Sequence, residues 1–270
     1  MERLSSAAYS AVRPLVPRAA DAGHMAFAHA VLDGAMPGLV LADRTDEPRS
    51  AFVCNLAGFW FALGEANEAF TAEALPELLA AASEEETGLW ATSREWERIL
   101  SRHFAVKRWR TEFHFDPATA VQPPALPPRM RLVPLDIPVL ERWGDGIDPW
   151  VVETLGGAAS FMERSFGFGV VDDEQLLSFC AGCAFQADGE REVEIEIGTS
   201  PFVREVGLGA IVARAFIDEC ANRHLLPAWT CASDNVPSER LAIRSGFRPV
   251  RKIAGFPVRA GMRKAGRLWV

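Results

Sequence analysis

The stretch that decides the fold spans residues 193–210 and reads VEIEIGTSPFVREVGLGA. Its first part alternates glutamates with β-branched residues, which is the period of a strand with one buried face. Pro201 then interrupts the pattern, and from Gly207 onward apolar residues recur with the helical repeat. The stretch therefore predicts a strand, a loop and a long helix in succession.

The glycines of this loop predict an anion site. Gly207 and Gly209 stand at the helix entrance, shortly after Arg204. Glycines in that position let successive backbone N–H groups converge on an anion, and the helix dipole adds to the attraction. We therefore expect the amides from Val206 to Ala210 to bind a diphosphate.

Two other phosphate-binding folds fit this loop less well. A dinucleotide-binding Rossmann fold also places Gly-x-Gly between a strand and a helix, but its third glycine is replaced here by Val212. Several residues also separate the strand from the glycines, where that fold needs a tight turn. A P-loop is excluded, since the sequence has no Gly-x-x-x-x-Gly-Lys-Ser/Thr.

Length and composition indicate a globular protein with two domains. The chain has 270 residues, of which 49% are hydrophobic and 24% charged, and a domain holds roughly 100–150 residues. Prolines gather between apolar segments, so we expect an N-terminal α/β domain at residues 1–116, a Pro-rich linker at 117–128 and a second domain at 129–270. The formal net charge of -8 argues against nucleic-acid binding and suits a cationic small substrate.

The sequence predicts a cytoplasmic protein. No apolar run reaches the roughly 18 residues of a membrane helix, and the five cysteines are spread through the chain rather than arranged as a disulfide framework. Cys180 and Cys183 have a redox-type spacing, but they lie in an expected strand, which favours buried, unreactive thiols. The histidines show no metal-binding spacing, so no metal site is expected.

Periodicity and breaker residues predict the remaining elements. Near the N-terminus we expect a short amphipathic helix that Pro14 ends. The rest of the first half should hold helices at 25–32, 68–82 and 94–104 and strands at 39–41, 50–54 and 106–115. The second half should hold strands at 130–135, 167–171, 176–185, 192–197, 228–231 and 248–253 and helices at 137–143, 156–165, 207–222 and 237–245.

Two motifs in the second half resemble the GNAT superfamily of N-acetyltransferases. The family's acyl-CoA loop, Arg/Gln-x-x-Gly-x-Gly/Ala, appears here as Arg204-x-x-Gly207-x-Gly209. The family's Asn-x-x-Ser/Ala helix, which ends in Gly-Phe, appears as Asn235, Ser238, Leu241, Ala242, Ser245, Gly246 and Phe247. The resemblance implies an α/β (α+β) fold with a GNAT-like mixed central sheet flanked by helices. It also implies that the smaller N-terminal domain is a reduced, GNAT-like unit.

The resemblance implies acetyl-CoA as co-substrate and assigns residues to it. The ligand is expected in the opening between the strand that ends near Ile197 and the strand at 228–231. The residues assigned to the cofactor are Ile197, Gly198, Thr199, Arg204, Glu205, Val206, Gly207, Leu208, Gly209, Ala210, Asn235 and Ser238.

Within the superfamily, the N-terminal half resembles a two-domain subgroup related to zwittermicin A resistance acetyltransferases. The residues that carry this second resemblance are Gly34, Pro37, Gly38, Asp43, Pro48, Arg49, Ser50, Ala51 and Gly64.

Catalysis needs a group that takes the proton of the amine, and two strand glutamates are the candidates. Glu194 lies where many family members carry a strand glutamate, and Glu196 shares its strand face. Both could instead face solvent on a half-buried sheet. One departure from the family is Ala242, which stands where a general-acid tyrosine is common, while the one tyrosine, Tyr9, lies in the other half.

These observations predict an N-acetyltransferase that moves an acetyl group from acetyl-CoA to a primary amine of a small molecule by direct attack on the thioester. The missing tyrosine keeps a second hypothesis open, a non-catalytic acyl-CoA binding or regulatory protein. A thiol with a pKa near about 8.5 can leave without an acid, so transfer stays compatible with Ala242. A homodimer is compatible with either hypothesis.

Overall fold

The computed structural model of the protein describes residues 1–17, 25–55, 58–82, 87–147, 149–153, 155, 157–185, 191–262, 264–265 and 268–269. The chain divides into two compact units. Unit 1 contains residues 1–111 and 252–270, and unit 2 contains residues 112–251. Among the described residues, no helix has the length and apolar character needed to cross a membrane.

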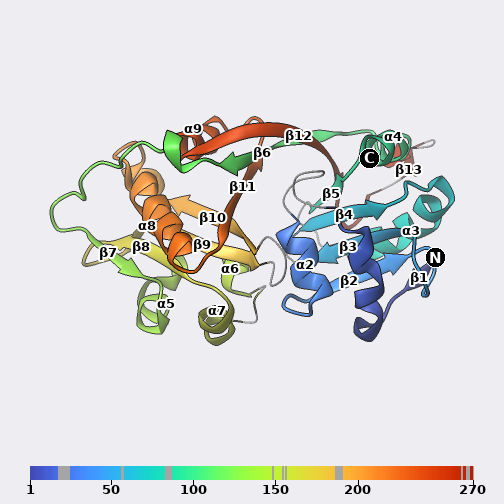
Figure 1. Ribbon diagram of the computed structural model, residues 1–270, viewed down its shortest axis with the longest axis horizontal. Helices are drawn as coiled ribbons and strands as arrows, with labels where there is room; N and C mark the ends of the chain where they lie inside the picture. Colours follow the sequence, from blue (N-terminus) through green and yellow to red (C-terminus); the bar gives the residue numbers. More distant parts are fainter. Residues whose placement is uncertain are drawn as a thin grey trace. The chain divides into compact units, whose positions relative to one another are not determined.

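Unit 1 is a sheet with helices packed on it (Figure 1). The strand order is β1-β2-β3-β4-β5-β12. Neighbouring strands run antiparallel except for β4 and β5, which are parallel and connected through α3. The elements of this unit are β1 (Glu2–Arg3), η1 (Ser6–Leu15), α2 (Ala26–Leu32), β2 (Gly38–Ala42), β3 (Ser50–Asn55), β4 (Phe59–Gly64), α3 (Glu68–Ala81), β5 (Thr87–Ala91), α4 (Arg94–Leu100) and the short pair β13 (Lys264–Ala265) and β14 (Leu268–Trp269).

Side-chain hydrogen bonds cap the N-termini of helices α3 and α4 in unit 1. The Asn67 side chain accepts a hydrogen bond from the Phe70 N–H, and the Ser93 hydroxyl accepts one from the Trp96 N–H. The capped residues Phe70 and Trp96 are buried, and both rings pack against Phe52 of β3. Each cap therefore fixes the position of a buried aromatic ring that packs on β3.

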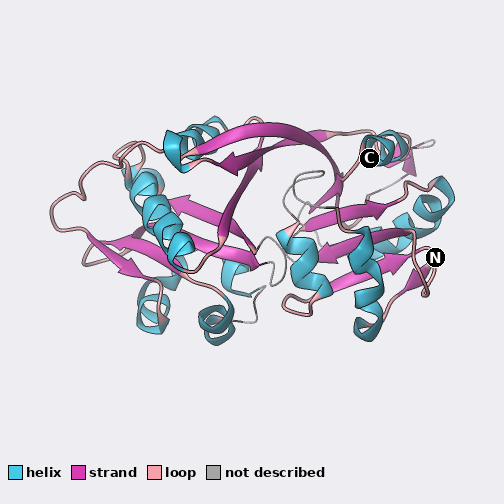
Figure 2. Ribbon diagram, viewed as in Figure 1, coloured by secondary structure: helices cyan, strands magenta, loops and turns pink. Residues whose placement is uncertain are grey.

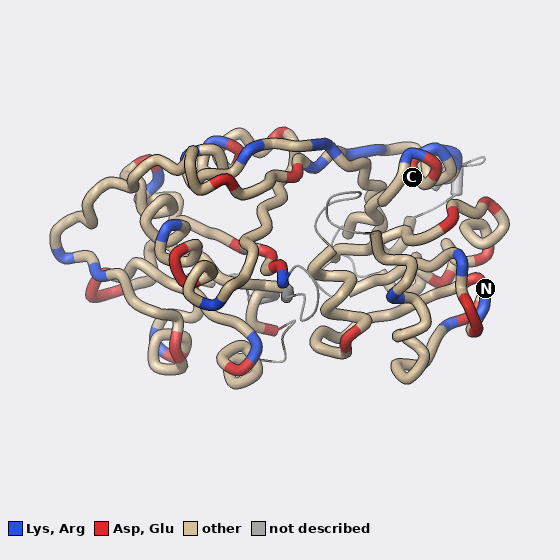
Figure 3. The backbone as a smooth tube through the Cα atoms, viewed as in Figure 1, with Lys and Arg blue, Asp and Glu red and all other residues tan. Residues whose placement is uncertain are grey.

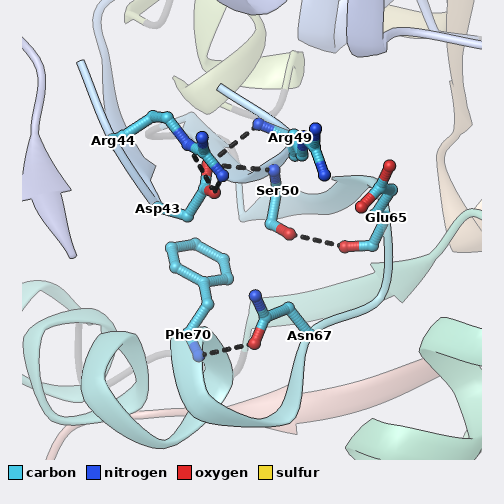
Figure 4. Close-up of polar contacts among 7 residues, drawn as sticks. All are labelled: Asp43, Arg44, Arg49, Ser50, Glu65, Asn67 and Phe70. Atoms are coloured by element: carbon cyan, nitrogen blue, oxygen red, sulfur yellow. Dashed lines mark hydrogen bonds and ion pairs between the residues drawn. The ribbon is translucent and has the colours of Figure 1, made fainter. Parts of the chain in front are cut away.

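The subgroup-like residues of the N-terminal half build one turn of unit 1 (Figure 4). Asp43 Oδ1 accepts hydrogen bonds from the N–H groups of Arg49 (2.9 Å) and Ser50 (3.1 Å), which closes the loop between β2 and β3. The Ser50 hydroxyl donates to the Glu65 carbonyl at 2.6 Å. Gly64 has φ +72°, and a Cβ there would overlap the Arg49 carbonyl oxygen. The contacts of these residues therefore stabilise the fold of unit 1.

Unit 2 is a second mixed sheet, with strand order β12-β6-β11-β10-β9-β8-β7. Figure 1 shows α8 lying across its strands, and β8, β9, β10 and β11 all contact that helix. The elements are β6 (Arg108–Phe115), η2 (Pro117–Thr119), β7 (Arg131–Pro134), α5 (Ile137–Trp143), η3 (Gly144–Gly146), α6 (Pro149–Glu153), α7 (Ala158–Arg164), β8 (Gly167–Val171), β9 (Leu176–Phe185), β10 (Glu192–Thr199), η4 (Pro201–Val203), α8 (Leu208–Asn222), β11 (Leu226–Ala232), α9 (Val236–Arg244) and β12 (Phe247–Val258).

The core of unit 2 lies between the sheet and α8. Phe216 of α8 is fully buried and stacks on Phe166 at a centroid distance of 4.7 Å. Trp229 of β11 and Phe247 of β12 pack at a centroid distance of 5.3 Å with their rings tilted by 59°. This apolar packing holds the first turns of α8 and α9 against the strands that precede them.

The structure confirms the predicted fold class, a mixed sheet flanked by helices. The structure also contains β4, β5 and α6, which the sequence analysis did not predict. Short apolar runs such as these have no clear period from which a helix or strand can be predicted. The expected N-terminal amphipathic helix is a 3₁₀ helix that contains Pro14 rather than ending there.

The compact units differ from the expected domain limits. Residues 112–128 belong to unit 2, and residues 252–270 belong to unit 1. The reason is the length of β12 (Figure 2), whose last residues, from Gly255 to Val258, pair with β5. Proline-rich composition marks a segment without regular structure, but it does not reveal which core a later strand joins.

The turn at Asp43 gives a first prediction. Burial raises the pKa of Asp43, but the hydrogen bonds from Arg49 and Ser50 and the Arg44 guanidinium outweigh it and hold the pKa below the ordinary value. A depressed pKa stabilises the fold at pH values above the unfolded-state value of about 3.9, and this stabilisation is lost as pH falls through the folded-state value. Asp43→Asn should therefore lower the free energy of unfolding at pH 7 by about 0.5–1 kcal/mol.

The difference between wild type and Asp43→Asn should fade in thermal unfolding experiments below pH about 4. Asp46→Asn is the matched control, because Asp46 is an exposed residue of the same loop. Equal losses in the two variants would show that Asp43 does not hold this turn.

Candidate active site

Two parallel strands of unit 2 separate partway along their length. β10 and β11 pair from Glu192 with Leu226 to Glu194 with Ala228. Beyond this point β10 continues to Thr199 and β11 to Ala232 without pairing to each other. The end of β10 from Ile197 to Thr199 is therefore not paired with β11, and the sequence predicted an opening between the same two strands.

The end of β10 keeps its strand geometry because β9 holds it from the other side. β9 pairs with β10 as far as Thr199, with a bulge between Glu194 and Ile195 where the two parallel strands part. The buried Ser178 hydroxyl donates to the Gly198 carbonyl at 2.9 Å and lies 2.8 Å from the Thr199 hydroxyl. The Ser178 hydroxyl thus holds the end of β10 on the side away from β11. We call these contacts with Gly198 and Thr199 the Ser178 clasp.

Gly198 fits this arrangement sterically. A Cβ at Gly198 would stand 2.5 Å from the ring of Phe179, its partner on β9. The Phe179 ring therefore fills the space that a side chain at position 198 would need. The assignment of Gly198 to the cofactor stays a prediction.

The loop before α8 has an unusual backbone conformation and leads into an uncapped helix. Glu205 and Gly207 have positive φ angles of +68° and +88°, and Gly207 is the N-cap of α8 without a side-chain cap. Within the described residues, no hydrogen-bond acceptor is found for the N–H groups of the segment from Val206 to Gly209. These donors, at the positive end of the helix dipole, suit an anion.

The anion loop and the strand end meet at Gly209. A Cβ there would stand 3.4 Å from the Thr199 hydroxyl oxygen and 3.1 Å from Leu241 Cδ2. The first turn of α8 therefore lies against both the end of β10 and helix α9. The end of β10 is thereby brought close to the loop from Arg204 to Ala210, and the assignment of these residues to one cofactor site stays a prediction.

Glu194 lies at the point of separation, and its side chain is almost fully buried. Its Oε1 accepts a hydrogen bond from the Thr230 hydroxyl of β11 at 2.8 Å. The carboxylate therefore does not face open solvent, which was the competing expectation. Glu196, two residues further on, is half-buried.

Asn235 and Ser238 already have partners in the fold. Asn235 Oδ1 caps α9 by accepting the Ser238 N–H at 3.2 Å. The Ser238 hydroxyl accepts the Trp229 indole N–H at 3.1 Å. Both residues hold the β11–α9 connection at the edge where α8 also begins, so a contact with a ligand would be additional to these bonds.

The other sequence features are buried or bonded within the fold, and the Cys183 thiol donates to the Glu194 carbonyl at 3.4 Å. Ala242 is fully buried in the core of unit 2, and Tyr9 donates its hydroxyl to the Gly38 carbonyl in unit 1. Cys180 and Cys183 are buried thiols, and burial raises the pKa of both well above the ordinary value, in keeping with unreactive cysteines. In the described part of the chain, no group of histidines, cysteines and acids has a metal-binding arrangement.

Sequence reasoning missed Ser178 and Thr230. Each acts through a partner that is distant in sequence, since Ser178 is 21 residues from Thr199 and Thr230 is 36 residues from Glu194. The only sequence signal was a hydroxyl residue within an otherwise apolar strand, which is too common to be informative.

Unit 1 repeats the topology of this region but not its opening. β3, β4, α3 and β5 follow one another as β9, β10, α8 and β11 do. However, β4 and β5 stay paired up to Ala62 and Ala91, the last residue of β5. The start of α3 carries its own Asn67 cap and the acidic Glu68, neither of which favours an anion.

The fold and site therefore define a GNAT-type acetyltransferase. The sequence profile of the GNAT acetyltransferase family matches residues 20–256, and the chain belongs to that family. An uncharacterized N-acetyltransferase of Bacillus subtilis (strain 168), YdfB, is 26% identical over 234 residues, which cover 83% of this chain and 87% of that protein. The similarity to zwittermicin A resistance proteins stays a prediction.

Solved structures share the fold across both units. A GCN5-related N-acetyltransferase-like protein from Streptococcus suis has a TM-score of 0.61 at 20% identity and covers 83% of this chain and 89% of its own. A tandem GNAT protein from the clavulanic acid biosynthesis pathway has a TM-score of 0.64 at 13% identity and covers 97% and 98%. These likenesses concern the fold alone.

The clasp gives a second prediction. Ser178→Ala should weaken binding of acetyl-CoA several-fold, because the end of β10 loses the hydrogen bond that keeps it extended, and should lower the free energy of unfolding by about 1 kcal/mol. Isothermal titration and denaturant unfolding would measure the two effects.

Ser165→Ala is the matched control for this clasp. The Ser165 hydroxyl is also buried and donates to a β9 carbonyl, that of Gly182, at 2.5 Å, but Gly182 pairs with Ile195 rather than with the strand end at Gly198 and Thr199. It should lose similar stability and keep its affinity. Equal affinities in the two variants would remove Ser178 from the site.

Proposed function

We propose that the protein is an N-acetyltransferase that transfers the acetyl group of acetyl-CoA to a primary amine of a small molecule. The observation that carries the proposal is the separation of β10 from β11 after Glu194 and Ala228, next to the uncapped start of α8. GNAT family members use acetyl-CoA as co-substrate, and this geometry supplies donors for both ends of an extended ligand.

The residues present fit coenzyme A. The N–H groups from Val206 to Gly209 have the position and polarity to hold a diphosphate. The unpaired edge of β10 from Ile197 to Thr199 offers peptide groups to the amides of the pantetheine arm. Arg204 is exposed beside the loop and adds positive charge.

Acetyl-CoA supplies an acyl thioester as the donor. In the reaction the amine nitrogen forms a bond to the acyl carbon, the carbon–sulfur bond breaks, and the thiol of coenzyme A leaves. The amine must lose a proton, and we assign its acceptance to Glu194, directly or through a water. The Thr230 hydroxyl orients this carboxylate by donating to Oε1.

No tyrosine stands at position 242 to protonate the departing sulfur. A thiolate with a pKa near about 8.5 is a tolerable leaving group, so the reaction does not require that acid. The proton taken up by Glu194 can return to the thiolate through solvent, which balances the transfer.

We also propose a reducing, cytoplasmic setting. All five cysteines are buried, and none forms a disulfide in the structure. Burial raises the pKa of the Cys220 thiol to about 12, which keeps it protonated and unreactive. Five free thiols in one chain are typical of proteins from compartments that keep cysteines reduced.

Binding of coenzyme A tests the anion loop. Gly207→Asp should weaken binding at least about tenfold relative to Gly207→Asn, because only the aspartate brings a negative charge to the diphosphate. The two side chains have the same size and meet the same positive φ, so steric effects cancel. Isothermal titration measures both, and equal affinities would place the diphosphate elsewhere.

Turnover tests the base. Glu194→Gln should leave the affinity for acetyl-CoA unchanged and lower kcat by about 10²–10⁴-fold, the range for loss of a general base. Thiol release from acetyl-CoA, measured over a panel of amino acid, polyamine, aminoglycoside and peptide amines, reports the rate. Glu196→Gln is the control and should keep most activity.

The same panel separates transfer from sensing. If wild-type protein binds acetyl-CoA tightly but acetylates no amine, the regulatory hypothesis replaces the enzymatic one. If Glu194→Gln turns over at the wild-type rate, Glu194 is not the base.

A further inference from the structure

The proline-rich segment at residues 120–127, here called the strap, is fixed to unit 2 at its start. The Val121 N–H donates to the Arg244 carbonyl at the end of α9, at 2.8 Å. Just upstream, the Asp116 N–H donates to the Gly246 carbonyl at 2.6 Å, and the Asp116 carboxylate pairs with Arg248 at 3.1 Å. The strap therefore departs from a defined point beside helix α9.

Charges on β12 contribute to this anchor. Figure 3 shows Lys and Arg residues along β6 and β12. On β12, Arg248 is paired with Asp116, and Arg251 is paired with the buried Glu112 of β6. These cations hold the strand that leads into the strap, so they are engaged within the unit.

The middle of the strap lies against the start of α8. A Cβ on Gly207 would overlap Cγ of Pro124 and stand 3.1 Å from its Cδ. The Pro124 ring thus packs directly on the backbone of the N-cap residue, although Pro124 itself is exposed. This contact requires glycine at position 207 independently of its φ of +88°.

The far end of the strap is held by the core. Leu126 and Met130 are partly buried and pack against the hydrophobic cluster of unit 2. The Met130 N–H donates to the Pro127 carbonyl at 3.2 Å, forming a turn before β7. The strap therefore runs from the end of α9 to the start of α8, the two helices that flank the separated strands.

Proline suits a chain segment beside an anion site. Pro123 and Pro124 have no N–H group, so they neither compete for the carbonyls of the loop nor need partners of their own. Their fixed φ angles also reduce the entropy lost when the strap docks. A stiff apolar wall leaves the donors of Val206 to Gly209 to the ligand.

We propose that the strap is a wall of the diphosphate part of the coenzyme A site, and that Pro124 sets the position of the Gly207 and Leu208 amides. This inference rests on the proposed function. Because the strap holds the loop in one conformation, docking of the strap and binding of coenzyme A stabilise each other. Pro124 is thus a positioning residue, and the strap is part of the site rather than a linker.

Affinity measurements test the inference. Pro124→Ala removes the atoms that contact Gly207 and should weaken binding of coenzyme A by about two- to fivefold, the effect of losing one proline restraint. Dephospho-coenzyme A, which keeps the diphosphate, should lose the same factor. Pantetheine, which lacks it, should bind both proteins equally. Pro128→Ala is the matched control, since Pro128 is an exposed proline beside the strap.

Hydrogen exchange provides a readout that does not depend on activity. In the wild-type protein, coenzyme A should slow exchange of the Val121 and Ala125 amides, because the bound ligand holds the strap in place. The slowing should be smaller in Pro124→Ala and unchanged in Pro128→Ala. Pantetheine should leave the exchange of these amides as it is in the free protein.

The outcomes distinguish this inference from the proposed function. If wild-type protein binds coenzyme A but the strap amides exchange at the same rate with and without it, or Pro124→Ala binds like wild type, the strap is not part of the site. If wild-type protein binds no coenzyme A, the proposed function fails and takes the inference with it.

Discussion

The structure of unit 2 depends on the separation of two parallel strands that would otherwise continue their ladder. β10 and β11 stop pairing after Glu194 and Ala228, which leaves the edge of β10 from Ile197 to Thr199 without its neighbouring strand. Buried backbone groups are costly unless another partner or a ligand satisfies them. The Ser178 clasp stabilises one side of the opening, and the Thr230–Glu194 hydrogen bond marks the point where it begins.

The two units show what this separation contributes. They share the succession of antiparallel strands, helix and parallel strand. In unit 1, however, the parallel strands β4 and β5 stay paired, and the helix that connects them, α3, starts with its own cap. A closed ladder and a capped helix stabilise a fold and leave no donors for an anion. We therefore propose that the chemistry takes place in unit 2, where the parallel strands separate and α8 starts without a side-chain cap.

The local parts of this site could be predicted from the sequence. The alternation of Glu194 and Glu196 indicated β10, and Gly207 indicated the helix entrance, because strand period and glycine conformation are properties of short segments. Contacts between distant segments could not be predicted in this way. The Ser178 clasp, the docking of Pro124 on Gly207, and the pairing of Gly255 with Trp90 of β5 depend on tertiary packing. For the same reason a proline-rich stretch that reads as a linker proves to be anchored at both ends.

The most direct test of the account is a crystal structure of the protein with coenzyme A. The account predicts the diphosphate within hydrogen-bond distance of the amides from Val206 to Gly209, and the pantetheine arm paired with the free edge of β10 between Ile197 and Thr199. A ligand bound elsewhere, with β10 and β11 still separated and unoccupied, would contradict it.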